Sequence, residues 1–153
     1  VHSNQMPIAI KNSIIDISSE ETTKELAKNF SNYLIGGEVI FLYGEMGVGK
    51  TTFVKYLIND FQLKFKEKLT EVTSPTFNIM NEYKVSDLII KHYDLYRLKS
   101  SKEVDNLNLF EKNHKSILLI EWPKIIKKKP NSLIELSFEY ENDYQNRFIK
   151  IIN

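Results

Sequence analysis

The feature that most constrains this chain is a glycine-rich loop at residues 44–51, with the pattern Gly-x-x-x-x-Gly-Lys-Thr. Residues 39–43, just before it, form a continuous β-branched and aromatic run, which is typical of a strand buried on both faces. After the loop, apolar residues recur at helical spacing over residues 50–61. A glycine loop between a buried strand and a helix is the P-loop, which binds nucleotide phosphates. The sequence therefore predicts a nucleotide-binding domain.

Each part of this loop has a chemical role in the prediction. The glycines let the backbone approach the phosphates without a Cβ in the way, and the amides that open the following helix point at the anion. Lys50 places a positive charge on the β- and γ-phosphates, and the Thr51 hydroxyl is the expected Mg²⁺ ligand. The loop residues expected to bind the nucleotide are Gly44, Glu45, Met46, Gly47, Val48, Gly49, Lys50, Thr51 and Thr52.

The rest of the chain alternates strand and helix patterns, which predicts an α/β fold. A helix is expected from Ser18-Ser19, a hydroxyl N-cap followed by two acids, to the Gly36-Gly37 pair. A short helix is expected over residues 103–110. The other expected strands are at residues 14–17, 72–84, 88–95, 117–120, 133–140 and 147–152. Because two pairs of these strands have the pattern of hairpins, the sheet should be mixed, parallel near the loop and antiparallel at its edges.

Length and composition fit one globular domain. The chain has 153 residues, of which 42% are hydrophobic and 27% charged, so we predict a single P-loop NTPase domain over residues 1–153, with helices flanking the sheet. Residues 1–5 are polar and receive no structural role. No apolar run approaches the roughly 20 residues of a membrane helix, and the absence of cysteine excludes a disulfide framework. A cytoplasmic location without membrane contact is expected, and the net charge of +1 predicts no general attraction to nucleic acid.

A P-loop enzyme also needs an acid that holds Mg²⁺ or positions water, usually at the end of a neighbouring buried strand. Glu121 ends the apolar strand expected at residues 117–120, and Asp94 lies at the end of the strand expected at residues 88–95. Each of them could instead be a solvated surface carboxylate. The residue pattern alone leaves both possibilities open.

Other residues near these acids have two possible roles. Trp122, the only tryptophan, could stack on the nucleotide base or cover the sheet edge, and packing is the commoner role. Residues 73–77 could be a switch that senses the γ-phosphate or an ordinary strand-entry turn. His92 is expected to be a packed or solvent-facing histidine. Only Arg97 and Arg147 are available if the chemistry uses an arginine from this chain.

Five segments of the chain resemble, in their order, the TsaE (YjeE-type) family of bacterial ATPases of tRNA threonylcarbamoyladenosine biosynthesis. They are residues 44–52, 72–77 (Val-Thr-Ser-Pro-Thr-Phe), 81–83 (Asn-Glu-Tyr), 92–97 (His-Tyr-Asp-Leu-Tyr-Arg) and 119–123 (Leu-Ile-Glu-Trp-Pro). The phosphate loop is generic, whereas the other motifs in this order are specific, and the likeness extends over nearly the whole chain. Lys124 is a departure, because many members carry an acid at that position.

The resemblance implies a mixed-sheet P-loop fold, ATP and Mg²⁺ as cofactors, and weak intrinsic ATPase activity. It also implies work with the TsaD and TsaB proteins, which install threonylcarbamoyl on the adenosine next to the anticodon of certain tRNAs, so that tRNA is met only through that complex. Carried onto this chain, Lys50 and Thr51 would bind phosphate and Mg²⁺, and Glu121 would assist the metal. The remaining implied site residues are Asp94 and Thr76 in the switch-like segments and Trp122 near the nucleotide.

Two alternatives remain open from the sequence. A small-molecule kinase would use the same loop to phosphorylate a metabolite hydroxyl, but it needs an acceptor pocket and usually an arginine-bearing lid, and this chain has two arginines. A nucleotide-dependent scaffold would need ATP occupancy alone, without hydrolysis. Because arginines are few, hydrolysis by the isolated chain should be slow, and partner binding should complete or gate the site.

Overall fold

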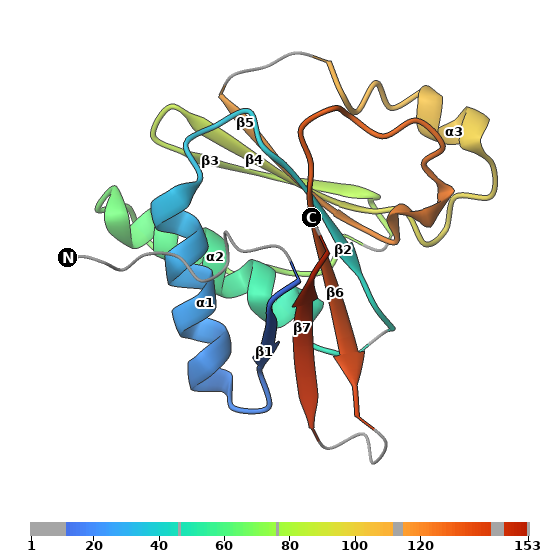
Figure 1. Cartoon of the computed structure of the whole chain (residues 1–153). Helices are drawn as coiled ribbons and strands as arrows, with labels where there is room; N and C mark the ends of the chain where they lie inside the picture. Colours follow the sequence, from blue (N-terminus) through green and yellow to red (C-terminus); the bar gives the residue numbers. More distant parts are fainter. Residues whose placement is uncertain (1–11, 46, 76, 112–114, 142–145, 153) are drawn as a thin grey trace.

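The computed structural model describes residues 12–45, 47–75, 77–111, 115–141 and 146–152 as one sheet flanked by helices (Figure 1). The strands are β1 (Ile14–Asp16), β2 (Val39–Tyr43), β3 (Met80–Val85), β4 (Leu88–Asp94), β5 (Ser116–Glu121), β6 (Ile134–Tyr140) and β7 (Arg147–Ile151). The helices are α1 (Glu20–Tyr33), α2 (Lys50–Lys64) and α3 (Ser101–Asp105), with a 3-10 turn, η2 (Pro123–Ile125). Helices α1 and α2 lie together on one side of the sheet, and α3 lies on the other side (Figure 1).

The seven-stranded sheet has the order β1-β7-β6-β2-β5-β4-β3 and is mixed, as predicted. β2 lies at its centre and pairs in parallel with both β5 and β6, and β4 also runs parallel to β5. The outer pairs β3–β4, β6–β7 and β1–β7 are antiparallel. The α/β fold class, with parallel strands beside the glycine loop and antiparallel strands at the edges, is therefore confirmed.

The apolar run of β2 is explained by a core on each face of the sheet. Ile40 and Leu42 belong to the core under α1 and α2, where Phe30 and Phe53 meet edge to face with ring centroids 5.5 Å apart. The alternate residues of the strand, represented by Phe41, belong to the second core on the α3 side. Successive side chains of a strand point to opposite faces, so a central strand with cores on both sides needs an unbroken apolar sequence.

The prediction of a strand over residues 72–84 is wrong for its first part, because β3 begins only at Met80. Pro75 has no amide hydrogen for a strand ladder, and its carbonyl instead accepts a hydrogen bond from the Ile79 amide at 2.6 Å. Ile79 also has a φ of +69°, which is costly for a β-branched residue and incompatible with an extended strand. The segment that leads into β3 is therefore a turn held by its own backbone contacts.

The helix boundaries differ in part from the prediction. The hydroxyl N-cap of α1 is confirmed, because the Ser19 side chain accepts a hydrogen bond from the Glu21 amide at 3.2 Å. The helix expected over residues 103–110 instead occupies Ser101–Asp105, and Asn108 beyond it has a φ of +51°, outside the helical region. Helix α2 continues to Lys64, one turn beyond the expected end. Within the described ranges, no helix combines the length and the apolar composition needed to cross a bilayer.

Candidate nucleotide-binding site

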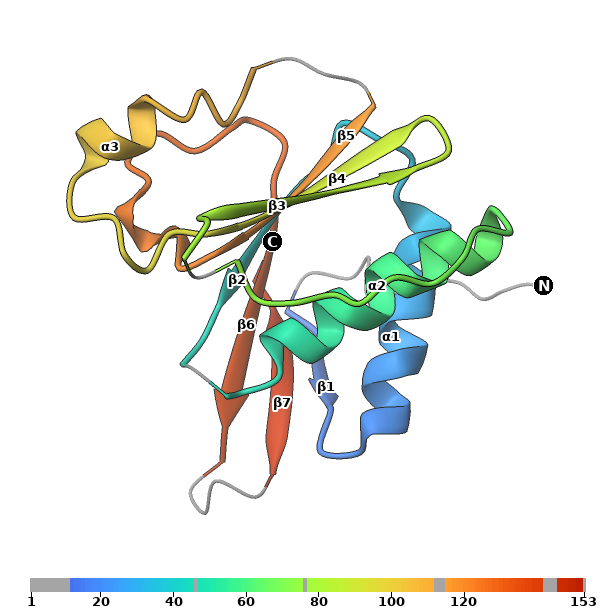
Figure 2. The same ribbon diagram turned by 180° about the vertical axis from the view of Figure 1, so that it is seen from behind.

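The glycine loop lies at the edge of the sheet where the parallel strands end, and from there the chain turns back into α2 (Figure 2). β2, β4 and β5 run in one direction, so their last residues meet at this edge, as in the ligand sites of open α/β sheets. Asp94 and Glu121 are direct neighbours in the β4–β5 register. A cavity of about 290 Å³ opens there, which we call the P-loop cleft. Its lining residues are Gly47, Gly49, Lys50, Thr51, Thr52, Ser74, Asp94, Glu121, Trp122 and Arg147.

Most of the residues predicted for the site lie together in this cleft, but not all of them. Gly44 and Glu45 line a neighbouring cavity of about 500 Å³. Val48 is fully buried and belongs to the core under α1 and α2, so it does not line the cleft. Met46 and Thr76, which were also predicted as site residues, lie outside the described residues.

Gly44 is the loop position where a side chain would disturb the structure most. Its φ is +144°, and a Cβ there would lie 2.6 Å from the Phe138 carbonyl oxygen of β6. We therefore expect Gly44→Ala to lower the free energy of unfolding by about 3 kcal/mol, from backbone strain and displacement of β6. Gly47→Ala is the control, because among the described residues a Cβ there meets only the Tyr140 hydroxyl, at 3.5 Å, and should cost about 1 kcal/mol. Urea denaturation measures both values, and equal losses would contradict this reading.

Lys50 is almost completely buried in the cleft, with 3% of its surface exposed. Its ammonium group donates to the Gly44 carbonyl, lies 4.1 Å from the centre of the Trp122 ring and lies 3.8 Å from Oε1 of Glu121. Burial lowers the pKa of Lys50 below its ordinary value, and the nearby carboxylates of Glu121 and Asp94 oppose that shift. The site therefore holds a desolvated positive charge, which an anionic phosphate group bound next to it would stabilise.

The two acids predicted for the site are both buried, which excludes their alternative role as solvated surface carboxylates. Asp94 accepts a hydrogen bond from the Tyr96 amide at 3.0 Å. Oε2 of Glu121 lies 2.6 Å from Nε2 of His92. No group of three or more histidine, cysteine or acidic side chains that could hold a metal ion occurs among the described residues.

Trp122 forms one wall of the cleft. It has a φ of +56°, an uncommon backbone conformation for a residue with a side chain. Its ring contacts that of Tyr96, with centroids 4.9 Å apart, and also faces the Lys50 ammonium. It lines both the P-loop cleft and the neighbouring cavity. The geometry therefore places Trp122 within the site rather than in a remote part of the core.

The structure shows which of the two arginines lies at the cleft, a choice that the sequence alone left open. Arg147 opens β7, and one of its guanidinium nitrogens lies 3.7 Å from the position that a Cβ on Gly49 would occupy. Arg97 is exposed and lies over the Phe77 ring, 5.2 Å from its centre. Of the two, only Arg147 lines the cleft. The rarity of arginine had reduced the candidates to these two, and the pairing of the C-terminal hairpin selects between them.

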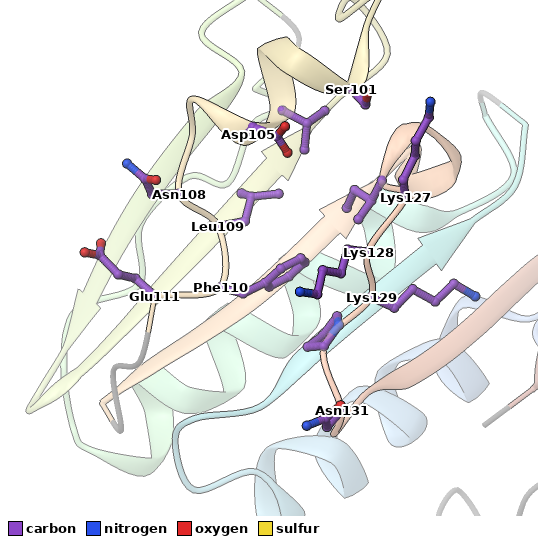
Figure 3. A pocket seen from close by; sticks show the side chains of 13 residues that line it. Ser101, Asp105, Asn108, Leu109, Phe110, Glu111, Lys127, Lys128, Lys129 and Asn131 are labelled. Carbon is purple, nitrogen blue, oxygen red and sulfur yellow. The ribbon is translucent and has the colours of Figure 1, made fainter.

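A larger cavity, of about 470 Å³, lies on the α3 side of the sheet. Figure 3 shows the lysine side chains of residues 127–129 across from Asp105 and Glu111. None of the residues predicted for the nucleotide line it, and its charges are mixed. Lys50, Thr51 and Glu121, which were predicted to bind phosphate and metal, line the smaller P-loop cleft instead.

Comparison with protein families decides the assignment. The model of the family "Threonylcarbamoyl adenosine biosynthesis protein TsaE" matches residues 17–149. The chain belongs to the TsaE family. A TsaE protein of Rickettsia bellii is 40% identical over 143 residues, which cover 93% of this chain and 96% of that protein. A TsaE protein of Rickettsia conorii is 42% identical over 111 residues, and this chain spans 61% of that relative's length.

The fold of the chain also matches a solved structure. The crystal structure of YdiB from Bacillus subtilis superimposes with a TM-score of 0.68 at 25% sequence identity. The match covers 97% of this chain and 87% of that protein. A TsaE protein of Aquifex aeolicus, 36% identical over 135 residues, extends the family likeness beyond the Rickettsia relatives. The relatives share a name that refers to tRNA threonylcarbamoyladenosine biosynthesis.

Proposed function

We propose that the chain binds ATP·Mg²⁺ in the P-loop cleft and hydrolyses it slowly, in support of the threonylcarbamoyl modification of tRNA adenosine by TsaD and TsaB. The observation that carries this proposal is that Lys50, Thr51 and the buried Glu121 line one cavity in a member of the TsaE family. The proposal includes a cytoplasmic location, where its tRNA substrate complex would be found.

The residues of the cleft fit the phosphates of a nucleotide and a magnesium ion. Helix α2 starts at the loop with no side-chain cap, so its first amides are suited to an anion. Lys50 would contact the β- and γ-phosphates, and Thr51, with Glu121 directly or through water, would hold the metal. Bound Mg²⁺ would neutralise charge that develops on the phosphates during hydrolysis.

Slow hydrolysis follows from what the chain itself supplies. Phosphoryl transfer to water needs positioning and charge neutralisation more than covalent chemistry. Arg147 is the only arginine that lines the cleft within the described part of the chain. We propose that a partner protein completes or gates the site, so that the rate changes when TsaD and TsaB bind.

Two segments could link the nucleotide to those partners. Ser74 brings the turn before β3 into the cleft, and Asp94 ends β4 there. We propose that ATP·Mg²⁺ orders the turn around residues 73–77 and the chain after Asp94, and that hydrolysis releases them. Residues 92–94 are buried in β4, so the part of the second segment that can move begins after them.

The small-molecule kinase remains the second candidate because of the cavity beside the loop. That cavity, of about 500 Å³, is lined by Glu45, Trp122 and Lys124 among others, and it could accept a metabolite next to the phosphate loop. A kinase transfers the γ-phosphate to its acceptor, whereas an ATPase releases it to water. Measuring whether the ADP formed is matched by free phosphate distinguishes the two.

The proposed function is tested by phosphate release from ATP, measured for the purified chain alone and with TsaD and TsaB added. We expect slow, Mg²⁺-dependent release by the chain alone and a changed rate when both partners are present. A rate indifferent to the partners would leave an ATPase with another role, and no Mg²⁺-dependent ATP binding at all would overturn the proposal.

Replacing Arg147 should weaken nucleotide binding, because its guanidinium group lies beside the phosphate loop. Charge-assisted hydrogen bonds contribute about 1.5–3 kcal/mol, so we expect Arg147→Ala to bind ATP·Mg²⁺ at least about tenfold more weakly. The fold should persist, because the contacts of Arg147 with Ile17 and Ser18 use its backbone. Arg97→Ala is the matched control, and calorimetric titration that gave both variants the parent's affinity would contradict the expectation.

A further inference from the structure

We propose that His92 is a positioning residue that holds Glu121 so that a single carboxylate oxygen, Oε1, faces the P-loop cleft. The inference deepens the proposed function and rests on it, because the role concerns how Glu121 meets Mg²⁺ or its bound water. The sequence alone suggested only a packed or solvent-facing histidine at this position.

The two side chains meet beneath the cleft on the α2 face of the sheet. Glu121 is the last residue of β5, and the parallel register sets Asp94 beside it and His92 beside Leu119. Nε2 of His92 lies 2.6 Å from Oε2 of Glu121, and His92 is fully buried. An ionised carboxylate can only accept, so the Nε2–H group of the imidazole donates. Such a short bond to a charged acceptor belongs to the stronger class of protein hydrogen bonds.

The other nitrogen of the same ring indicates that this contact is not simply good packing. Nδ1 of His92 is buried and has no hydrogen-bond partner among the described residues. An unpaired buried polar atom costs about 1–3 kcal/mol, which an apolar side chain at this position would avoid. The unpaired Nδ1 therefore lowers the free energy of unfolding, whereas Nε2 of the same ring bonds Glu121.

The remaining oxygen of Glu121 is the one available to a ligand. Oε1 lies 3.8 Å from the Lys50 ammonium, and Glu121 lines the cleft. With Oε2 bonded to His92, Glu121 presents mainly Oε1 to the cleft. A single carboxylate oxygen suits the octahedral geometry of Mg²⁺, whether the contact is direct or through a bound water. Without His92, the carboxylate could rotate and pair fully with Lys50.

The test compares two substitutions at position 92. His92→Leu removes the N–H donor and puts an apolar side chain of similar size in its place, whereas His92→Gln keeps an N–H group that can reach Oε2. Second-layer partners of metal ligands typically affect metal affinity by about 10–100-fold. Mg²⁺ raises the affinity for ATP by a certain factor, and we expect this factor to be about tenfold smaller in His92→Leu than in the parent. The affinity for ATP without Mg²⁺ should be unchanged. His92→Gln should keep most of the parent's factor.

The affinities are read from the fluorescence of Trp122, the only tryptophan, or by calorimetry, with and without Mg²⁺. A purely structural role would lower the unfolding temperature and the metal-free affinity without changing the Mg²⁺ dependence. A wild-type Mg²⁺ dependence in His92→Leu, or equal losses in both variants, would overturn the inference. If the parent chain itself did not bind ATP·Mg²⁺, the proposed function would fail instead.

A spectroscopic readout keeps the inference testable if His92→Leu does not fold. The parent chain should show a slowly exchanging imidazole Nε2–H signal in NMR spectra, assigned by its loss in His92→Gln. That signal should shift or broaden in Glu121→Ala and stay unchanged in Glu139→Ala, because Glu139 bonds Ser137 rather than the histidine. If the Nε2–H signal were the same in Glu121→Ala as in the parent, it would contradict the hydrogen bond on which the inference depends.

Discussion

Lys50→Met should bind ATP·Mg²⁺ about a hundredfold more weakly than the parent chain. Its ammonium group is proposed to contact two phosphates, charge-assisted hydrogen bonds contribute about 1.5–3 kcal/mol each, and a hundredfold loss corresponds to about 2.7 kcal/mol. Methionine keeps an unbranched stem beside Trp122 and removes the charge, so the loss reports electrostatics rather than a cavity. Calorimetric titration with ATP·Mg²⁺ measures the affinity.

Lys55→Met is the matched control for this prediction, because Lys55 lies on the exposed side of the same helix, α2. It should bind ATP·Mg²⁺ as the parent does. Lys50→Ala should lose affinity at least as strongly as Lys50→Met. A Lys50→Met chain that bound and hydrolysed ATP like the parent would show that the phosphate-loop assignment is wrong.

The same substitution has a pH-dependent effect on stability. Burial lowers the folded-state pKa of Lys50 below its ordinary value of 10.5, so between these two pKa values the unfolded chain binds more protons than the folded chain. The free energy of unfolding of the parent, relative to Lys50→Met, should therefore rise with pH in that window and be constant below it. Denaturation at several pH values measures this, and a difference that fell with rising pH would contradict it.

Glu121→Gln should lower ATP hydrolysis by about a hundredfold or more while ATP binding persists. The carboxylate is the acid placed to hold the metal or to orient the attacking water, and such groups contribute about 10²–10⁴-fold to rate. Glutamine keeps the shape and can still hydrogen-bond His92, but it removes the negative charge. Phosphate release at saturating ATP measures the rate, and calorimetry measures the affinity.

Glu139→Gln is the control for loss of a carboxylate near the loop. Glu139 lines the cavity beside the P-loop cleft but not the cleft itself. Glu139→Gln should hydrolyse ATP at the parent's rate. Wild-type hydrolysis by Glu121→Gln would remove Glu121 from the catalytic machinery. If the variant bound ATP, failed to hydrolyse it and still supported full tRNA modification, the nucleotide-dependent scaffold would be favoured over the hydrolase.

The fold was largely predictable because its signals are local. The apolar run of β2, the glycine loop and the apolar face of α2 follow one another in the sequence, and their periodicities differ clearly. Glu121 was also identifiable, because an acid directly after an apolar strand falls at the sheet edge where the loop lies. These inferences need only the order of the elements and the direction of the strands.

Other features depended on long-range pairing that one sequence does not specify. The His92–Glu121 contact joins residues 29 positions apart and needs the register of β4 against β5. Arg147 reaches the loop only because β7 pairs with both β6 and β1. The error over residues 72–79 has a different origin, since the positive φ of Ile79 contradicts its β-branched propensity.

The measurement that tests the central claim most directly is threonylcarbamoyl transfer to tRNA in a reconstituted mixture of TsaD, TsaB, ATP·Mg²⁺ and the threonylcarbamoyl donor. The account predicts that adding the chain raises the amount of modified tRNA over repeated turnovers, and that Lys50→Met does not. Equal modification with the chain, with Lys50→Met and with neither would contradict it.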